Sequence, residues 1–387
     1  MLLGLSALLL VVGAGCSAVQ EQPTETTETT AQEDMSPIKI GFLGPLTGDL
    51  ASIGQDALKG AELAVEEINA AGGINGRMLE LVAEDGKCNP KDASAAGNKL
   101  INIDNVPVIV GGLCSPETTA VAPVAEQNKV VMFSPCSSAP NITEAGDYIF
   151  RSYPSDAYQG TFAANYVYNT LGKKKVALFA DLGDWGAGVK GSFEAAYKEL
   201  GGEILVVEDI RQTDRDFRTQ LTKVKSSEAE LIYFAGLPEA GLAFFKQAQE
   251  LGVELPILGG DVLSDTSLVE AEVSNGVQYI IADVEAKGQE WLDKLAVKGA
   301  NNTLCAPGSY NNVNILADIM TRVGTDTEMI KNEMYNVKDY QGVNMMVTLD
   351  ENGDLEGASY VVKEIQNGES VEPQMTEEAE TTETTEE

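Results

Sequence analysis

Residues 41–90 read GFLGPLTGDLASIGQDALKGAELAVEEINAAGGINGRMLELVAEDGKCNP, and this stretch decides the fold. An apolar run over Ile38–Leu43 leads into it and predicts a buried strand. The segment Gly54–Ala71 predicts a helix, because small and aliphatic residues recur there at helical spacing: Ala57, Ala61, Ala64, Val65 and Ile68. Gly72-Gly73 ends that helix, Asn75-Gly76 turns the chain, and Leu79–Ala83 predicts a second strand.

The same alternation continues along the chain. Further strands are expected over Val106–Val110, Val130–Phe133, Val176–Phe179, Ile204–Val207, Leu231–Phe234, Pro256–Leu258 and Val277–Ile281. Continuous apolar runs are typical of strands covered on both faces, and Gly252 ends another helix over Glu239–Leu251. The pattern predicts an α/β protein with two doubly wound lobes of parallel sheet. Ligands of such folds lie at the carboxyl ends of the strands, so we expect a site between the lobes.

Charge and composition narrow the function. The chain carries a formal charge of −34 and contains no histidine. The stretches Gln20–Asp34 and Gln366–Glu387 hold 5 and 8 acidic residues and no Lys or Arg, which leaves about −21 for the body. Such a surface repels nucleic-acid phosphates and argues against nucleic-acid binding. The lack of histidine removes the commonest general base and zinc ligand, so neither an enzyme nor a metal site is expected, and no motif calls for a cofactor.

The N-terminus has the character of an export signal. Residues 1–15, MLLGLSALLLVVGAG, form an apolar run that is too short to span a bilayer comfortably, and Cys16 follows directly. The segment resembles a lipoprotein signal, in which the cysteine is lipidated and becomes the mature N-terminus. A plain cleaved signal and a buried apolar N-terminus remain alternatives. Either export interpretation places the mature chain outside the cytoplasm, and lipidation would anchor it to the membrane.

Two segments lack the apolar residues that a folded core needs. Residues 16–35 and 366–387 are rich in Thr and Glu, and both are predicted to be disordered. The first is interpreted as a tether between the lipid and the folded part, and the second as an acidic tail.

Residues 41–90 resemble the N-terminal block of the leucine/isoleucine/valine-binding proteins, which have the type I periplasmic-binding-protein fold. The resemblance continues from Ile38 to Glu364 through VGGLCSPETT, VVMFSPCSSAPNIT, RSYPSDAYQG, DLGDWGAG, GLPE, GGD and LDENGDLEG. It implies two α/β lobes joined by three crossings of the chain, with a cleft that closes around the ligand. On this map the first lobe covers 36–157 and 284–345, and the second covers 158–283 and 346–365.

A free amino acid presents a carboxylate, an ammonium and a side chain, so its receptor needs hydroxyl or amide donors, an acidic group and an apolar recess. The resemblance implies that the hydroxyls of Ser115 and Ser138 donate to the ligand carboxylate. It also implies that backbone groups of Cys136 and Ser137 contact the ligand. Asp261 matches the position that receives the ammonium, where the family commonly has Glu. Taken singly, Ser115 and Asp261 have simpler interpretations as helix caps.

The side chain of the ligand meets apolar residues in this family. Ile53 and Leu237 match positions that face it, Tyr310 matches an aromatic lining the same region, and Trp185 stands where Tyr is usual and can roof the cleft. These residues favour leucine, isoleucine or valine, while alanine, an aromatic amino acid and a small amide remain open. No Arg or Lys matches a site position, which argues against an acidic amino acid.

The cysteines divide into two pairs. The resemblance implies a disulfide between Cys88 and Cys114, in the blocks GKCNP and GLCSP. Cys136 and Cys305 match positions that are not cysteines in the family, and two free thiols are expected there. A metal site is disfavoured, since the chain has no His and no C-x-x-C.

These features predict a solute-binding lipoprotein of an ABC importer, with a small amino acid as ligand and membrane permease subunits as partners. A ligand-binding sensor module is the alternative, because the same fold serves as the outer part of some receptors. An enzyme is the third hypothesis, but a serine nucleophile lacks a histidine base, and the acidic pairs Asp181/Asp184 and Asp214/Asp216 are expected to be loop and helix-cap residues.

Overall fold

The computed structural model describes residues 35–283, 288–300, 304–357 and 359–373. The expected signal segment 1–15, the lipidated Cys16 and nearly all of the tether lie outside the described residues. None of the helices in the described part is both long and apolar enough to cross a membrane.

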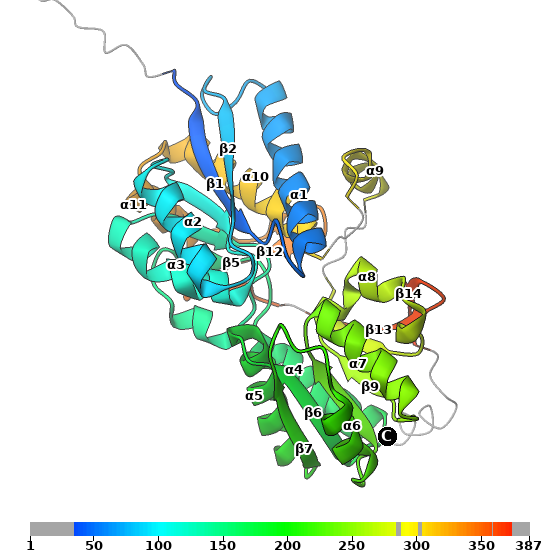
Figure 1. Ribbon diagram of the computed structural model, residues 1–387. Helices are drawn as coiled ribbons and strands as arrows, with labels where there is room; N and C mark the ends of the chain where they lie inside the picture. Colours follow the sequence, from blue (N-terminus) through cyan, green and yellow to red (C-terminus); the bar gives the residue numbers. More distant parts are fainter. Residues whose placement is uncertain (1–34, 284–287, 301–303, 358, 374–387) are drawn as a thin grey trace, which may run out of the picture. The chain divides into compact units, whose positions relative to one another are not determined.

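The first lobe is built on a parallel sheet of five strands in the order β2-β1-β3-β4-β5 (Figure 1). Its strands are β1 (Ile38–Gly44), β2 (Leu79–Asp85), β3 (Val108–Gly111), β4 (Val131–Ser134) and β5 (Ile149–Arg151). The helices between them are α1 (Ala51–Ala70), α2 (Pro90–Asn102), α3 (Ser115–Asn128) and the short η1 (Pro140–Glu144). In Figure 1, α1 lies on one side of β1 and β2, with α2 and α3 on the other side. The lobe is therefore doubly wound.

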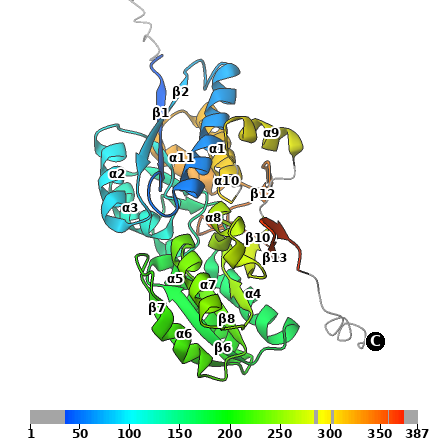
Figure 2. The same ribbon diagram turned by 45° about the vertical axis from the view of Figure 1, so that its right-hand side comes forward.

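The second lobe is built on seven strands in the order β14-β13-β10-β9-β8-β6-β7 (Figure 2). Its strands are β6 (Lys175–Asp181), β7 (Glu203–Ile210), β8 (Leu231–Ala235), β9 (Ile257–Gly259), β10 (Gln278–Ala282), β13 (Tyr360–Gln366) and β14 (Glu369–Val371). Its helices are α4 (Asp156–Asn165), η2 (Tyr166–Thr170), α5 (Asp184–Glu199), α6 (Arg218–Lys225), α7 (Pro238–Glu250), η3 (Asp261–Ser264), α8 (Thr266–Val269) and η4 (Glu272–Ser274). All nine strands expected from the sequence are present.

After β10 the chain returns to the first lobe. This part contains α9 (Gln289–Val297), α10 (Ala306–Val323), α11 (Thr327–Met334), β11 (Tyr340–Gln341) and β12 (Met346–Val347). Both α9 and α10 pack against α1, and β13 then rejoins the second sheet. The chain thus passes between the lobes three times, after β5, after β10 and before β13.

Small residues let α1 and α10 approach closely. Ala57, Ala61 and Ala64 are fully buried, in agreement with the helical spacing in the sequence. A Cβ atom on Gly60 would lie 2.3 Å from the carbonyl oxygen of Ala306, so only glycine fits at this crossing. At the C-terminal end, Gly72 adopts a φ of 107°, which ends the helix as predicted.

The edges of the second sheet differ from the sequence prediction. β13 pairs antiparallel with β10, so this sheet is mixed rather than wholly parallel. On the opposite edge, no described strand pairs with the outer side of β7, and the side chains of Leu205 and Val207 on one of its faces are exposed.

The expected acidic tail begins later than residue 366. Gln366 ends β13, and Glu369–Val371 pair with it as β14. Asn367 and Gly368 both have positive φ, as a two-residue hairpin turn requires. Asn-Gly is a typical hairpin signal in a sequence. The polar residues around it nevertheless favoured the prediction of a disordered tail from residue 366. Residues 374–387 of the tail lie outside the described residues.

Candidate ligand-binding site

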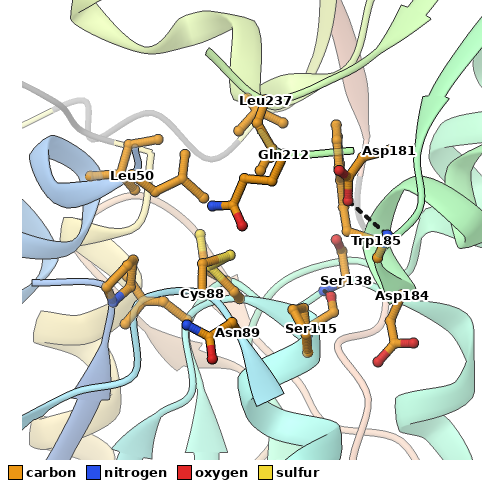
Figure 3. Close-up of a pocket in the computed structure, with 18 of the residues that line it drawn as sticks. Leu50, Cys88, Asn89, Ser115, Ser138, Asp181, Asp184, Trp185, Gln212 and Leu237 are labelled. Carbon is orange, nitrogen blue, oxygen red and sulfur yellow. Dashed lines mark hydrogen bonds between the residues drawn. A yellow bond between two sulfur atoms is a disulfide. The ribbon is translucent and has the colours of Figure 1, made fainter. Parts of the chain in front are cut away.

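A pocket of about 420 Å³ is lined by residues of both lobes (Figure 3). The first lobe contributes the segments that follow β1, β2, β3 and β4, and the second contributes those that follow β6, β7, β8 and β9. Seven of the nine predicted ligand contacts line it: Ile53, Ser115, Cys136, Ser138, Trp185, Leu237 and Asp261. The carboxyl ends of the strands therefore bring most of the predicted site together, as the fold class implies.

Two serine hydroxyls form the floor on the side of the first lobe. Ser115 begins α3, and its Oγ accepts hydrogen bonds from the backbone N–H of Ser138 (3.2 Å) and of Ala139 (3.1 Å). With its acceptor capacity used in this way, the Ser115 hydroxyl can donate its own proton to a ligand oxygen. The N-terminal end of α3 adds a partial positive charge at the same place. An anionic group, such as a carboxylate, suits this floor.

A buried arginine fixes the loop that carries Ser138. The Arg151 guanidinium is fully buried and forms two bonds to Asp354, from Nε to Oδ1 at 2.7 Å and from Nη2 to Oδ2 at 2.5 Å. Its Nη1 donates to the backbone carbonyls of Ser138 (3.1 Å) and Ala139 (2.9 Å). Asp354 belongs to the block LDENGDLEG, so this distant segment helps to position the serine loop.

Asp261 supplies the acidic group on the side of the second lobe. It follows β9 and is only 6% exposed. Its Oδ2 accepts a hydrogen bond from Tyr153 Oη at 2.7 Å. Burial raises the pKa of the Asp261 carboxyl, and the hydrogen bond from Tyr153 and the nearby Gln159 side chain act in the opposite direction. A cationic group that entered the pocket would offset the cost of keeping this carboxylate ionised.

A second buried carboxyl, which the sequence analysis missed, belongs to the same region. Asp156 begins α4 with no exposed surface, and neither carboxyl oxygen has a hydrogen-bond partner of good geometry among the described residues. Burial raises its pKa well above the ordinary value, the charge of Asp261 raises it further, and Ser138 and Arg151 lower it. The region therefore holds two acidic groups, while the nearby Arg151 is engaged by Asp354.

Apolar side chains form the rest of the wall. Ile53 and Leu237 are buried at 5% and 7% exposure, and Leu50, Leu113 and Val262 join them on the lining. Trp185 is half-buried in the first turn of α5, and a Cβ on residue 260 would lie 3.0 Å from its Cζ2. The absence of a side chain at Gly260 thus leaves space for the indole.

Two predicted residues do not reach the pocket. The Tyr310 hydroxyl donates to Glu67 at 2.5 Å and its ring packs on Trp291, so this side chain lies between α10, α1 and α9. Ser137 is buried beneath the lining, where its backbone N–H donates to Ser134 Oγ at 2.9 Å. Its hydroxyl bonds to Gly112 and Leu113 carbonyls, which gives it a role in holding the loop.

Both cysteine pairs are disulfide-bonded. Cys88–Cys114 was implied by the resemblance, with Cα atoms 5.3 Å apart. Cys136–Cys305 corrects the expectation of two free thiols. The loop after β4 and the start of α10 meet at the pocket, and their Cα atoms lie 5.5 Å apart, well within disulfide range. All four cysteines line the pocket.

Four polar residues on the loops line the pocket although the sequence did not predict them as ligand contacts. Gln212 and Arg211 follow β7 and line the pocket, although nothing in their spacing indicates a site. Asp181 and Asp184 line it as well, at the end of β6 and the start of α5, and Asp181 Oδ1 accepts the Gly183 N–H at 2.8 Å. Their positions match the predicted loop and helix start. Within the described ranges, no group of three or more His, Cys, Asp or Glu residues could hold a metal ion.

Comparisons with known proteins point to one family. A family model described as "Periplasmic binding protein" matches residues 37–369. An amino acid binding protein from Pseudomonas aeruginosa is 32% identical over 341 residues, which cover 85% of this chain and 90% of that protein. The leucine-, isoleucine-, valine-, threonine- and alanine-binding protein of the same organism is 30% identical, with 84% and 89% coverage.

Solved structures agree. The branched-chain amino acid transporter substrate-binding protein LivJ from Streptococcus pneumoniae, in complex with isoleucine, has 31% identity and a TM-score of 0.80, with 86% of this chain and 97% of that chain covered. The leucine-binding protein LivK from Thermotoga maritima has 28% identity and a TM-score of 0.80, with 87% and 99% coverage.

Proposed function

The chain belongs to the periplasmic binding protein family, and on that premise we propose that it captures a free amino acid with an aliphatic side chain outside the cytoplasm and delivers it to the permease of an ABC importer. Its relatives are named for amino acids, chiefly leucine, isoleucine and valine. The observation that carries the proposal is the buried carboxylate of Asp261 in one pocket with the hydroxyls of Ser115 and Ser138.

The three parts of an amino acid each have a partner in this pocket. The carboxylate binds at the N-terminal end of α3, where the Ser115 hydroxyl donates a hydrogen bond. The ammonium pairs with Asp261, whose carboxylate has no ion-pair partner among the described residues. The aliphatic side chain packs against the wall that contains Leu50, Ile53 and Leu237. Each charge of the ligand is thus compensated when water leaves the pocket.

Ligand screening followed by calorimetry tests this proposal. Amino acids are first screened by thermal shift, since a ligand at 100 times its Kd stabilises the protein by about 2.7 kcal/mol. Asp261→Ala is expected to weaken binding of the selected amino acid by about 2–5 kcal/mol, because the ammonium loses its partner. Ser115→Ala is expected to cost about 1.5–3 kcal/mol, for one hydrogen bond to a charged group. If Asp261→Ala binds as tightly as the parent, the ligand carries no ammonium and the amino-acid assignment falls.

The membrane anchor is a separate part of the proposal. Cys16 follows the apolar run 1–15 and lies outside the described residues, so its lipidation rests on the sequence alone. Lipidation would hold the protein at the outer face of the membrane, near its permease partner. Cys16→Ser is expected to move the protein from the membrane fraction into the medium or the soluble fraction. Undiminished membrane retention of this variant would argue against the anchor.

A further inference from the structure

The end of the pocket remote from the serines carries polar side chains that an aliphatic ligand does not use. Figure 3 shows the Gln212 side chain between Leu50 and Leu237, with its amide extending toward the Cys88 disulfide. Arg211, its neighbour, is the one basic residue among the described residues that line the pocket. The sequence analysis expected no basic side chain there, because no Arg or Lys matches a family site position.

Hydrogen bonds fix the backbone of the loop after β7, whereas the side chains of its first two residues, Arg211 and Gln212, are available to bind a ligand. The Arg211 N–H donates to Asp214 Oδ2 at 2.9 Å, and the Gln212 carbonyl accepts from Arg215 Nη1 at 2.6 Å. Arg215 also reaches Asp49 of the first lobe at 3.1 Å, beside Leu50. No hydrogen bond or ion pair within the described ranges engages the Gln212 amide or the Arg211 guanidinium. The loop is therefore held over the pocket with its donors unused.

The side-chain amide of Asn89 differs from that of Gln212 in being engaged by other residues. Asn89 lines the pocket too, but its Oδ1 accepts the Asp92 N–H at 3.0 Å as the N-cap of α2. Its Nδ2 donates to the Asp92 carboxylate at 2.9 Å. Asn89 is thus engaged by its own helix, and Gln212 has no such role.

The pocket also has room beyond an aliphatic amino acid. If each of the about nine non-hydrogen atoms of leucine takes the roughly 30 Å³ of a water molecule in the liquid, leucine needs about 270 Å³. The pocket measures about 420 Å³. The remaining space suits a few more atoms at the end of the ligand side chain.

We propose that Gln212 and Arg211 form a subsite for an oxygen atom at the end of the ligand side chain. The preferred ligand is then an amino acid with a short apolar stem that ends in an amide or a carboxylate. The stem packs on Leu50 and Leu237, and the terminal oxygen accepts hydrogen bonds from Gln212 and Arg211. Gln212 is half-buried, so a ligand that fills the pocket and leaves its amide unpaired binds more weakly. This inference rests on the proposed binding of a free amino acid, and it replaces the purely aliphatic side chain of that proposal with one that has a polar end.

Three ligands with the same number of non-hydrogen atoms test the subsite in the purified protein. Glutamine and glutamate carry terminal oxygens, and homoleucine has methyl groups in their place. Calorimetry is expected to show that one of the two polar ligands binds at least about tenfold more tightly than homoleucine. Gln212→Leu is expected to reduce that ratio, and Thr213→Val, a change in the same loop away from the pocket lining, is expected to leave it unchanged. Arg211→Gln separates the two polar ligands, because only a carboxylate gains strongly from the guanidinium.

Each result has a definite meaning. A parent protein that binds homoleucine as tightly as the polar ligands, with no effect of Gln212→Leu on the ratio, overturns the subsite and leaves amino-acid binding intact. If neither these three ligands nor any aliphatic amino acid binds, the proposed function fails together with the subsite. Unchanged melting temperatures without ligand show that the substitutions do not act through folding.

Discussion

Two buried carboxyl groups, those of Asp156 and Asp261, contribute to the pH dependence of the stability of the ligand-free protein. Both have raised pKa values because they are buried, and the charge of Asp261 adds to the effect on Asp156. The other titratable or charged groups in this region are Arg151, already paired with Asp354, and the hydroxyls of Tyr153, Tyr233 and Tyr360. Burial raises the pKa of all three tyrosines well above the ordinary value, so they stay neutral and compensate no charge.

The sign of the pH dependence follows from the raised pKa of Asp156. Between its ordinary pKa, near 4, and its higher value in the folded protein, the folded state holds a proton that the unfolded state has lost. Stability of the empty protein therefore falls as pH rises through that window, by at most about 1.4 kcal/mol per pH unit for one group. Asn at this position has nearly the same shape and cannot ionise.

Asp156→Asn is therefore expected to flatten the decline of stability with rising pH in the ligand-free protein. Urea unfolding at a series of pH values from acid to neutral measures the slope for parent and variant. Asp293→Asn, an exposed change on α9, serves as the matched control and should follow the parent. Parallel curves for the parent and Asp156→Asn would contradict the assignment of this buried acid.

At the scale of single residues, sequence motifs singled out candidate ligand-binding residues that follow the ends of strands. Ser115, Ser138 and Asp261, which the family resemblance singled out, all line the pocket. Tyr310 was misplaced, since one position on α10 decides whether a side chain faces the cleft or α1. Asp156 was missed because a helix-start aspartate has an ordinary capping interpretation, and only the packing around α4 reveals its burial.

At the scale of elements, each serine-bearing loop is held by a disulfide. Cys114 directly precedes Ser115, and Cys136 lies two residues before Ser138. Glu117 reinforces the first loop, accepting the N–H groups of Cys88 and Cys114 at 3.0 Å each. Burial raises the pKa of Glu117 to about 7. These bonds limit the motion of the loops before a ligand arrives, and such preorganisation lowers the cost of binding.

Most elements could be predicted because apolar runs and helical spacing report burial directly. The strands without long apolar runs were missed: β11 and β12 have two residues each, β5 and β14 have three, and in β13 only Tyr360–Val362 form an apolar run. The second disulfide could not be predicted from spacing, since Cys136 and Cys305 are separated by 169 residues. Only the packing of α10 against the first lobe brings them together.

At the scale of the whole molecule, several polar contacts between described residues join the lobes around the pocket, among them the following three. Ser52 Oγ donates to Asp265 Oδ2 at 2.5 Å, Thr119 Oγ1 donates to Asp184 Oδ2 at 2.6 Å, and Arg215 pairs with Asp49. None of them depends on a ligand. They stabilise the arrangement in which both lobes line the pocket, and they do so equally whichever ligand is inside.

The Ser52–Asp265 contact offers a clean test of closure. Ser52 is an exposed residue of α1 outside the pocket lining, and Asp265 keeps its bond from the Ser267 N–H when the Ser52 hydroxyl is removed. Affinity scales with the population of the closed form, so a loss of about 1 kcal/mol for one hydrogen bond lowers affinity about fivefold. Ser52→Ala is thus expected to weaken every ligand by the same factor.

Calorimetry with two ligands of different affinity separates closure from direct contact. The ratio of the two Kd values should be the same in Ser52→Ala and in the parent, because the change acts on the lobes and not on the ligand. Ser94→Ala is the matched control: its hydroxyl bonds to Pro90 within α2 and joins no lobes, so both affinities should stay at the parent values. A change in the ratio would mean that Ser52 senses the ligand itself, and unchanged affinities would mean that this contact contributes nothing to closure.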